Sequence, residues 1–292
     1  MTKEEFKEKL GKEIRKNIPN VILEEAKSQR NNGPVEAIMV KIKETPYGLA
    51  LRYAETYQDI VNSGYDPEAT IYQIVKDLKN RIDDIDNSGI KDSENLLTDY
   101  AFVKSHIRPV LVNKDKNKDL VLRELCGDLA IAFKIYLNDE MSIRVTKAIE
   151  DGWKKVWKEG ISDFYTSAFE NEKQVPEFYA SLDDIVRRAS MPLPDDYDSY
   201  AYIISNEKCC WGAIKVLTSQ TVKEMAARLG GCYIIPSSIH ECILIPKTEY
   251  NDFTEDMNEF ISMVNANEVR PDEVLSDSLY FMDECGLITL AV

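Results

Sequence analysis

The sequence is poor in histidine and lacks the common motifs for binding nucleotides and metals. His106 and His240 are the only histidines in the chain, so the usual His-Glu-x-x-His zinc site is excluded. Neither the Gly-x-Gly-x-x-Gly loop nor the Gly-x-x-x-x-Gly-Lys-Ser/Thr loop occurs. The Gly-x-Ser-x-Gly elbow and the EF-hand calcium loop are missing too. We therefore expect no cofactor and no metal site, although a Mg²⁺ or Ca²⁺ site built from carboxylates alone stays open.

The sequence also lacks a long apolar run and paired cysteines. No segment approaches the roughly 18 apolar residues of a membrane span. The first ten residues resemble a charged helix, without the apolar core of a signal peptide. The six cysteines form no Cys-x-x-Cys, and the adjacent Cys209 and Cys210 cannot easily bridge each other. Free and mostly buried thiols are typical of a reducing compartment, so we expect a cytoplasmic protein without a membrane partner.

Negative charge is concentrated in the C-terminal part of the chain. The formal net charge is −15, and from Pro176 to the end 20 Asp and Glu stand against 8 Lys and Arg, a balance of −12. A phosphate backbone would be repelled by this part. We therefore expect no nucleic-acid partner, which leaves an unknown protein or a small-molecule ligand.

Hydrophobic spacing predicts a small N-terminal unit over residues 1–104, in which helices pack on a sheet. Apolar residues recur every four positions in residues 2–17, which indicates an amphipathic helix, and Thr2 with Glu5 forms a capping box. Asn31-Asn32-Gly33 is a turn signal between two β-rich runs. The predicted elements are helix 2–17, strands 21–26, 35–42 and 48–51, and helices that begin near residues 53, 67 and 93.

Residues 105–292 are predicted to form a larger α+β unit with a mostly antiparallel sheet. Its strands come in pairs joined by turn residues, which favours antiparallel pairing over a doubly wound parallel sheet. The predicted strands are 106–112, 128–137, 141–145, 201–205, 213–217, 232–235, 239–245, 278–282 and 287–290. The predicted helices are 120–125, 146–157, 162–172, 182–189 and 218–229, followed by one that Thr254 caps.

The stretch from Gly230 to Pro246 organises this unit. Two β-rich runs flank Pro236-Ser237-Ser238, and proline and serine are turn formers, so we predict a β-hairpin. His240 and Glu241 belong to the second run near the turn, where both can reach water. Either they are a satisfied polar pair at a loop end, or they form a site at the hairpin mouth with the two serines.

Three nucleophiles near His240 are poor candidates for catalysis. Ser237 and Ser238 lie too close to His240 in the chain to reach a substrate carbonyl freely, and no oxyanion-hole sequence is evident. Cys242 shares a strand face with His240. Strand rise places these two side chains roughly 6–7 Å apart, which is too far for a direct hydrogen bond.

A series of short strings in the C-terminal unit carries a family likeness. The strings are Tyr202-Ile203-Ile204-Ser205-Asn206-Glu207, Gly212-Ala213, Leu229-Gly230-Gly231, the span from Tyr233 to Glu241, Val264-Asn265-Ala266 and Val274-Leu275-Ser276-Asp277. They resemble a bacterial domain-of-unknown-function family from anaerobic Gram-positive gut bacteria, and the Pro-Ser-Ser-Ile-His-Glu hairpin motif is the most specific of them. Ser205 and Cys209-Cys210-Trp211 depart from the family pattern, where threonine and a small polar stretch are expected. The resemblance spans most of the chain and implies no activity.

Two functions are compatible with these observations. The first is a non-catalytic binding or interaction protein, which the acidic composition and the missing motifs favour. The second is a hydrolase or transferase with a site built from Ser237, Ser238, His240, Glu241 and Asn206. A catalytic site predicts a concave pocket and a partly exposed His240 in contact with a carboxylate. An interaction module predicts an exposed apolar patch or an open sheet edge instead.

Overall fold

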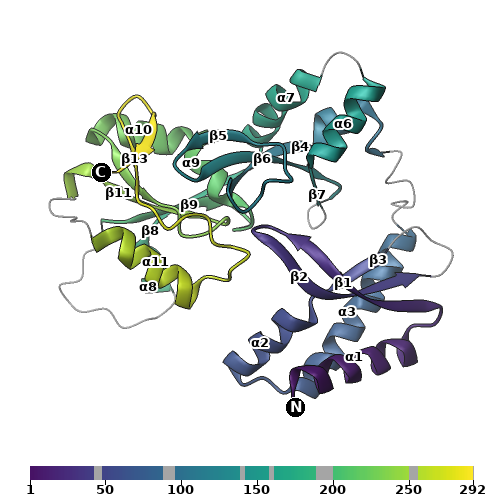
Figure 1. Ribbon diagram of the computed structural model, residues 1–292. Coiled ribbons are helices and arrows are strands. Elements are labelled where there is room, and N and C mark those ends of the chain that lie inside the picture. Colours follow the sequence, from purple (N-terminus) through teal and green to yellow (C-terminus); the bar gives the residue numbers. More distant parts are fainter. Residues whose placement is uncertain are drawn as a thin grey trace. The chain divides into compact units, whose positions relative to one another are not determined.

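The computed structural model describes residues 1–42, 48–87, 96–138, 142–157, 161–188, 200–249 and 256–291. The chain divides into two compact units, Met1–Leu96 and Leu97–Val292 (Figure 1). The boundary that the sequence predicts, between residues 104 and 105, falls inside helix α5 (Tyr100–His106). Both units combine helices with antiparallel sheets, so the predicted α+β class is confirmed.

The N-terminal unit packs helices on a three-stranded antiparallel sheet with the order β1-β2-β3. Thr2 and Glu5 form the predicted capping box. Apolar side chains of the first helix are fully buried, as their spacing requires, and Asn31-Asn32 turns the first strand into the second. The elements are α1 (Lys3–Asn17), β1 (Val21–Arg30), β2 (Gly33–Ile42), β3 (Gly48–Leu51), α2 (Tyr53–Ser63) and α3 (Pro67–Asn87).

The first sheet of the C-terminal unit has the order β4-β6-β5, and β7 also pairs with β6. Helices cover it with an aromatic core, in which Phe133, Trp153 and Phe164 are buried. The predicted pairing of 128–137 with 141–145 is confirmed, although Asp139 and Glu140 of its predicted turn 138–140, and Met141, lie outside the described residues. The elements are α5, β4 (Ile107–Asn113), β5 (Arg123–Cys126), β6 (Leu129–Tyr136), β7 (Ser142–Arg144), α6 (Lys147–Val156) and α7 (Ile161–Lys173).

The second sheet of this unit is six-stranded and antiparallel, with the order β13-β12-β10-β11-β9-β8. Its core contains Ile204, Ile234, Leu244 and Tyr280, all of which are buried. The elements are β8 (Glu177–Ser181), α8 (Leu182–Arg188), β9 (Tyr202–Asn206), the 3₁₀ helix η2 (Gly212–Ile214), α9 (Lys215–Thr218), α10 (Gln220–Leu229), β10 (Cys232–Ile235), β11 (Cys242–Pro246), the 3₁₀ helix η3 (Lys247–Glu249), α11 (Asp256–Glu268), β12 (Tyr280–Met282) and β13 (Ile288–Leu290).

Three local predictions in the C-terminal unit need correction. The predicted helix 120–125 is wrong, because Leu120 bridges to Thr146 and the following residues form β5 against β6. The predicted strand 213–217 is wrong, because the chain enters η2 and α9 there; a short apolar run does not distinguish a buried strand from a buried helix. Strand β8 was missed, and the cap predicted at Thr254 lies outside the described residues.

The central hairpin is confirmed as a pair of neighbouring antiparallel strands, β10 and β11, but its second strand is shorter than predicted. Pairing starts at Ile243 opposite Ile235, and β11 begins at Cys242 instead of Ile239. Ile239 leaves the ladder because its amide donates to the carbonyl of Glu273 at 2.9 Å. His240 and Glu241 therefore belong to a loop.

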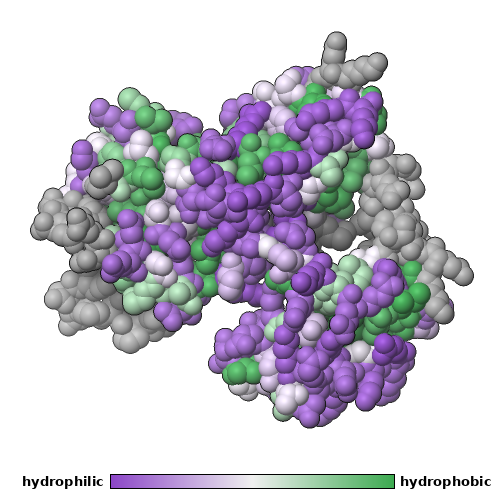
Figure 2. Space-filling view, viewed as in Figure 1, coloured by the Kyte–Doolittle hydropathy of each residue, from purple (hydrophilic) through white to green (hydrophobic). Residues whose placement is uncertain are grey.

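Hydrophilic side chains cover most of the face shown in Figure 2, on both units. Exposed large hydrophobic side chains are distributed over several elements, including Val61 on α2, Tyr72 on α3, Val156 on α6, and Phe260 and Met263 on α11. Among the helices that the structure describes, none is both long and apolar enough to cross a membrane.

Candidate active site

Three chain segments meet beside the six-stranded sheet, although they are far apart in sequence. One follows β9, one joins β10 to β11, and one precedes β12. Backbone hydrogen bonds tie them together: the Ala213 amide donates to the Ile239 carbonyl at 3.3 Å, and the Ile239 amide donates to the Glu273 carbonyl at 2.9 Å. Ile239 thus ties the segment between β10 and β11 to both of the other segments.

The first segment is a tight turn that presents Cys210 to solvent. The side-chain amide of Asn206 brackets Cys210, since its Oδ1 accepts from the Cys210 amide at 3.1 Å and its Nδ2 donates to the Cys210 carbonyl at 2.7 Å. Cys209 (φ 48°) and Trp211 (φ 57°) both adopt the left-handed region, which non-glycine residues rarely occupy. Such strain clusters at functional sites. Cys210 is exposed at the centre of this turn.

Gly212 allows this turn to approach the His240 backbone. A Cβ atom on Gly212 would lie 2.2 Å from Ser205 Oγ and 2.7 Å from the His240 carbonyl oxygen. Ser205 Oγ donates to that same carbonyl at 2.7 Å. Only glycine fits here, so the position of His240 depends on the absence of a side chain at 212.

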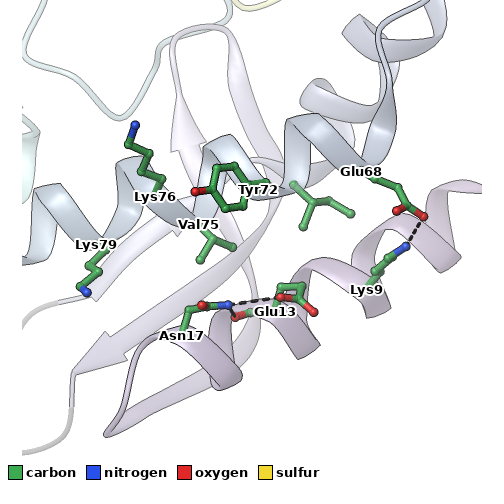
Figure 3. A pocket seen from close by; sticks show the side chains of 9 residues that line it. Lys9, Glu13, Asn17, Glu68, Tyr72, Val75, Lys76 and Lys79 are labelled. Carbon is green, nitrogen blue, oxygen red and sulfur yellow. Dashed lines mark hydrogen bonds and ion pairs between the residues drawn. The ribbon is translucent and has the colours of Figure 1, made fainter.

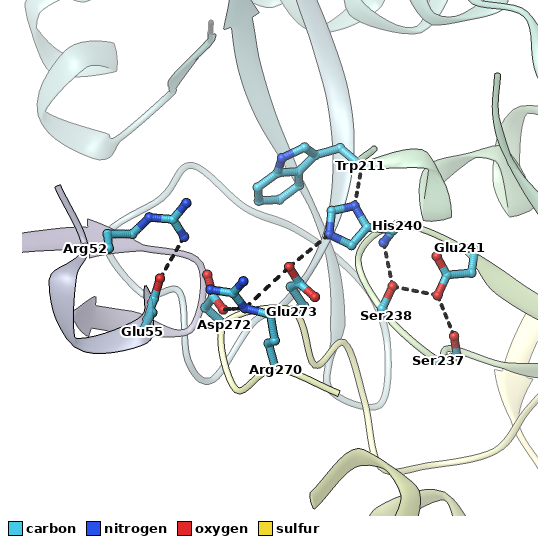
Figure 4. A network of polar contacts seen from close by, with 10 residues as sticks. All are labelled: Arg52, Glu55, Trp211, Ser237, Ser238, His240, Glu241, Arg270, Asp272 and Glu273. Carbon is cyan, nitrogen blue, oxygen red and sulfur yellow. Dashed lines mark hydrogen bonds and ion pairs between the residues drawn. The ribbon is translucent and has the colours of Figure 1, made fainter. Parts of the chain in front are cut away.

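The His240 ring lies between two partners (Figure 4). The Trp211 amide donates to Nδ1 at 3.2 Å, and Nε2 is 3.4 Å from Oε1 of Glu273. Glu273 also lies near Arg270, whose Nε is 3.9 Å from the same oxygen. The His240 side chain is 23% exposed. It therefore combines a carboxylate partner with access to solvent.

The thiol of Cys210 interacts with the His240 ring, and each group shifts the other. The hydrogen bond with His240 is the main cause that lowers the pKa of the Cys210 thiol, and Lys134 lowers it further. The Cys210 contact and then the Glu273 contact raise the pKa of His240 to about 9. The Trp211 amide opposes this rise, because its hydrogen bond favours an unprotonated Nδ1. Charge separation between thiolate and imidazolium is thereby favoured.

A cavity of about 370 Å³ opens beside Cys210 and Trp211. Its lining includes Asn206, whose side chain holds the Cys210 backbone, His106 from the end of α5, Arg108 from the start of β4, and Tyr136 from the end of β6. This volume is within the range of small-molecule sites. An exposed nucleophile at such a cavity has room for a bound substrate.

Ser237, Ser238 and Glu241, which the sequence also predicted for the site, do not contact the His240 ring. Ser237 Oγ and Ser238 Oγ both donate to Glu241 Oε1 at 2.8 Å, and Ser238 Oγ accepts from the His240 amide at 2.9 Å (Figure 4). Ser238 is buried. These three side chains stabilise the loop that carries His240, whereas the imidazole ring faces Glu273.

The other cysteine near His240 does not reach it. Cys242 is fully buried, its thiol lies 3.8 Å from the Ala213 carbonyl oxygen, and burial raises its pKa. The structure thus pairs His240 with Cys210, which sequence reasoning treated only as a free thiol. No local pattern distinguishes Cys210 from Cys209, or Glu273 from the other acids of the C-terminal part. The Trp211-Gly212 step was the single available signal of an unusual turn.

A second cavity, of about 330 Å³, lies between α1 and α3 of the N-terminal unit (Figure 3). Lys9 pairs with Glu68 at one end, and the Asn17 side chain donates to the Glu13 carbonyl at 2.8 Å. Its lining includes Lys76, Lys79 and Tyr72 but no cysteine, histidine or serine. It offers no nucleophile. Within the described segments, no group of three or more His, Cys, Asp and Glu side chains is placed to hold a metal ion.

Fold and site together define an α+β protein in which an exposed cysteine, Cys210, precedes a residue whose amide donates to a histidine ring, and that ring lies 3.4 Å from a carboxylate. The chain belongs to the family of unknown function DUF5688, whose model matches residues 3–284 and so includes both units. The likeness to a domain-of-unknown-function family is confirmed at that level. No curated protein and no solved structure matches the chain.

Proposed function

We propose that the protein is a thiol-dependent hydrolase or acyltransferase in which Cys210 is the nucleophile. His240 is its acid–base partner, Glu273 orients the imidazole, and Asn206 is a positioning residue. The observations that carry the proposal are the exposed Cys210, the neighbouring Trp211 amide that donates to Nδ1 of His240 at 3.2 Å, and the Glu273 carboxylate 3.4 Å from Nε2 of the same ring. A nucleophile, its base and an orienting group form the recurring arrangement of covalent catalysis.

Of the two functions open from the sequence, the geometry favours the catalytic one, with a different nucleophile. His240 is partly exposed and contacts a carboxylate, as a catalytic site requires. The hydroxyls of Ser237 and Ser238 are bound to Glu241, so they are poorly placed to attack a substrate. Exposed hydrophobic residues are spread over several elements, which gives less support to a dedicated interaction patch.

The chemistry follows from the three side chains. The Cys210 thiolate attacks an acyl carbon and forms a C–S bond, while the bond from that carbon to the leaving group breaks and His240 gives the leaving group a proton. Water or another acceptor then attacks the thioester and gives a proton to His240. The C–S bond breaks and the thiolate returns. No step requires a redox partner.

We further propose that the protein works in the cytoplasm of a bacterium. All six cysteines are free, and Cys209, Cys210 and Cys285 are exposed. Exposed thiols stay reduced in a cytoplasm kept reducing by low-molecular-weight thiols. The bacterial origin follows the family likeness of the hairpin motif in 236–241.

The test is the rate at which iodoacetamide alkylates individual cysteines of the full chain at pH 6.5, followed by mass spectrometry. Cys285, which is also exposed, is the internal control. We expect Cys210 to react at least about tenfold faster, because an ordinary thiol has little thiolate at this pH. The Cys210→Ser variant should lose the acyl-enzyme burst with p-nitrophenyl acetate, and Cys285→Ser should keep it. Equal alkylation rates at the two cysteines would reject the proposal in favour of a binding protein without chemistry.

A further inference from the structure

Cationic side chains stand in a row on the sheet that supplies Arg108 to the cavity beside Cys210, although the chain as a whole is acidic. Arg108 and Lys134 are directly opposite each other on β4 and β6, and Lys134 is opposite Arg144 on β7. Opposite residues of antiparallel strands point to the same face. The sheet therefore carries a row of three cations across adjacent strands, an arrangement that like-charge repulsion disfavours unless anions are near.

Two of these cations are held against aromatic rings at the cavity. The Arg108 guanidinium carbon is 4.7 Å from the centre of the Tyr136 ring, and Lys134 Nζ is 3.7 Å from the centre of the Trp211 ring. Lys134 is buried. Cation–π contacts orient a cation without cancelling its charge. The Arg108 side chain is thus oriented while it keeps its charge.

The cavity lining has two carboxylates, Glu172 and Glu207, and two cations, Arg108 and Lys208, but Glu172 is already paired. Glu172 lines it, but its Oε1 is 2.9 Å from Lys215 Nζ, and both side chains are buried. Glu207 is an exposed lining residue, and Lys208 beside it has the opposite charge. Arg144 Nη2 is 3.7 Å from Asp119 Oδ2. Arg108 acts electrostatically on Glu172, but among the described residues it forms no hydrogen bond or ion pair with a carboxylate, so its N–H groups are available to a ligand.

We infer that the cavity beside Cys210 binds a small molecule that carries a carboxylate, which Arg108 holds while Cys210 attacks the acyl group. This inference rests on the proposed function of Cys210 and names its substrate class. The planar guanidinium binds a carboxylate through two parallel hydrogen bonds. The cavity volume, about 370 Å³, fits a small acid. Lys134 and Lys208 add to the attraction without needing direct contact.

The probe is iodoacetate, an alkylating carboxylate, compared with the neutral iodoacetamide at pH 7. For each cysteine the ratio of the two rates removes its intrinsic reactivity. We expect the ratio at Cys210 to exceed the ratio at Cys285 by about fivefold or more, the effect of a favourable charge pair near the surface. The comparison is made within the unmodified protein, so it does not depend on the folding of a variant.

Two variants assign the preference to Arg108. Arg108→Gln should lower the iodoacetate-to-iodoacetamide ratio at Cys210 several-fold and leave the iodoacetamide rate within about twofold. Lys223→Gln changes the net charge equally on the exposed face of α10 and should leave the ratio unchanged. The His240 imidazolium, Lys134 and Lys208 also attract anions, so part of the preference should survive in Arg108→Gln.

The outcomes separate this inference from the proposed function. Fast iodoacetamide labelling of Cys210 with an iodoacetate ratio equal to that of Cys285 would overturn the carboxylate site and keep the nucleophile. An equal loss of preference in Arg108→Gln and Lys223→Gln would also overturn it, because only net charge would then matter. Slow iodoacetamide labelling of Cys210 would instead overturn the proposed function.

Discussion

Nε2 of His240 lies 3.4 Å from Oε1 of Glu273, whereas Glu241, its neighbour in sequence, accepts hydrogen bonds from Ser237 and Ser238. Two carboxylates are thus near the same histidine: Glu241 is next to it in the sequence, and Glu273 is next to its ring in space. One stabilises the loop backbone, and the other contacts the ring. Substituting each of these two glutamates in turn therefore tests whether the carboxylate at the imidazole ring matters.

We predict that Glu273→Gln slows iodoacetamide alkylation of Cys210 at pH 7 by about threefold to tenfold, while Glu241→Gln changes it by less than about twofold. Glu273 is one of the two groups that raise the pKa of His240. Its loss lowers the pKa of His240 and so weakens the imidazolium that favours the thiolate. This effect exceeds the direct repulsion by which Glu273 raises the pKa of Cys210, the smallest of the causes acting on that thiol, and a charge contact of this kind is worth about that factor. Peptide mapping of both variants measures the rates. Equal effects of the two substitutions would show that the ring does not depend on Glu273.

The pH profile of Cys210 alkylation should depend on His240. In the wild type the pKa of the Cys210 thiol is lowered, mainly by His240, so its alkylation rate should rise with pH well before that of an ordinary thiol. In His240→Gln the rise should move to the usual thiol range, about pH 8.5, and the rate at pH 7 should fall about tenfold. At about pH 10 both proteins hold the thiolate and the rates should converge. Superimposable profiles would contradict the contact.

Turnover should have an alkaline limit that alkylation lacks. His240 must carry a proton for the leaving group, and its pKa is raised to about 9. Hydrolysis of p-nitrophenyl acetate does not need that proton, because its leaving group, p-nitrophenolate, is a weak base. The expected result is therefore a rate that falls above about pH 9 for an alkyl ester but not for p-nitrophenyl acetate. A common plateau for both esters would remove the acid role of His240.

Gly212→Ala should destabilise the C-terminal unit and slow Cys210 labelling. The added methyl group would lie 2.2 Å from Ser205 Oγ and 2.4 Å from the Asn206 amide nitrogen. Overpacking of this kind costs about 1–3 kcal/mol of unfolding free energy. Gly152→Ala in α6 is the control, since no atom lies within 4 Å of its Cβ position and alanine should stabilise the helix by about 0.5–1 kcal/mol. Chemical denaturation of both variants measures the difference.

Much of the fold could be predicted because its signals are local. The capping box of Thr2 and Glu5, the Asn31-Asn32 turn and the hairpin around residues 236–241 each depend on residues that are close in the chain. The prediction was wrong for 213–217, where a short apolar run fits either a strand or a helix until its neighbours are known. Asn206 and His240 were predicted for the site, but the groups they contact were not.

The sequence by itself determined the α+β class, the antiparallel hairpins and the acidity of the C-terminal part, since periodicity, turn residues and charge are properties of short segments. Only the tertiary structure decided that Cys210 faces His240 and that His240 faces Glu273. The pairing of β9 with β11 and of β10 with β12 brings these segments together. Strand order across a sheet sets which side chains converge, and no local pattern encodes it.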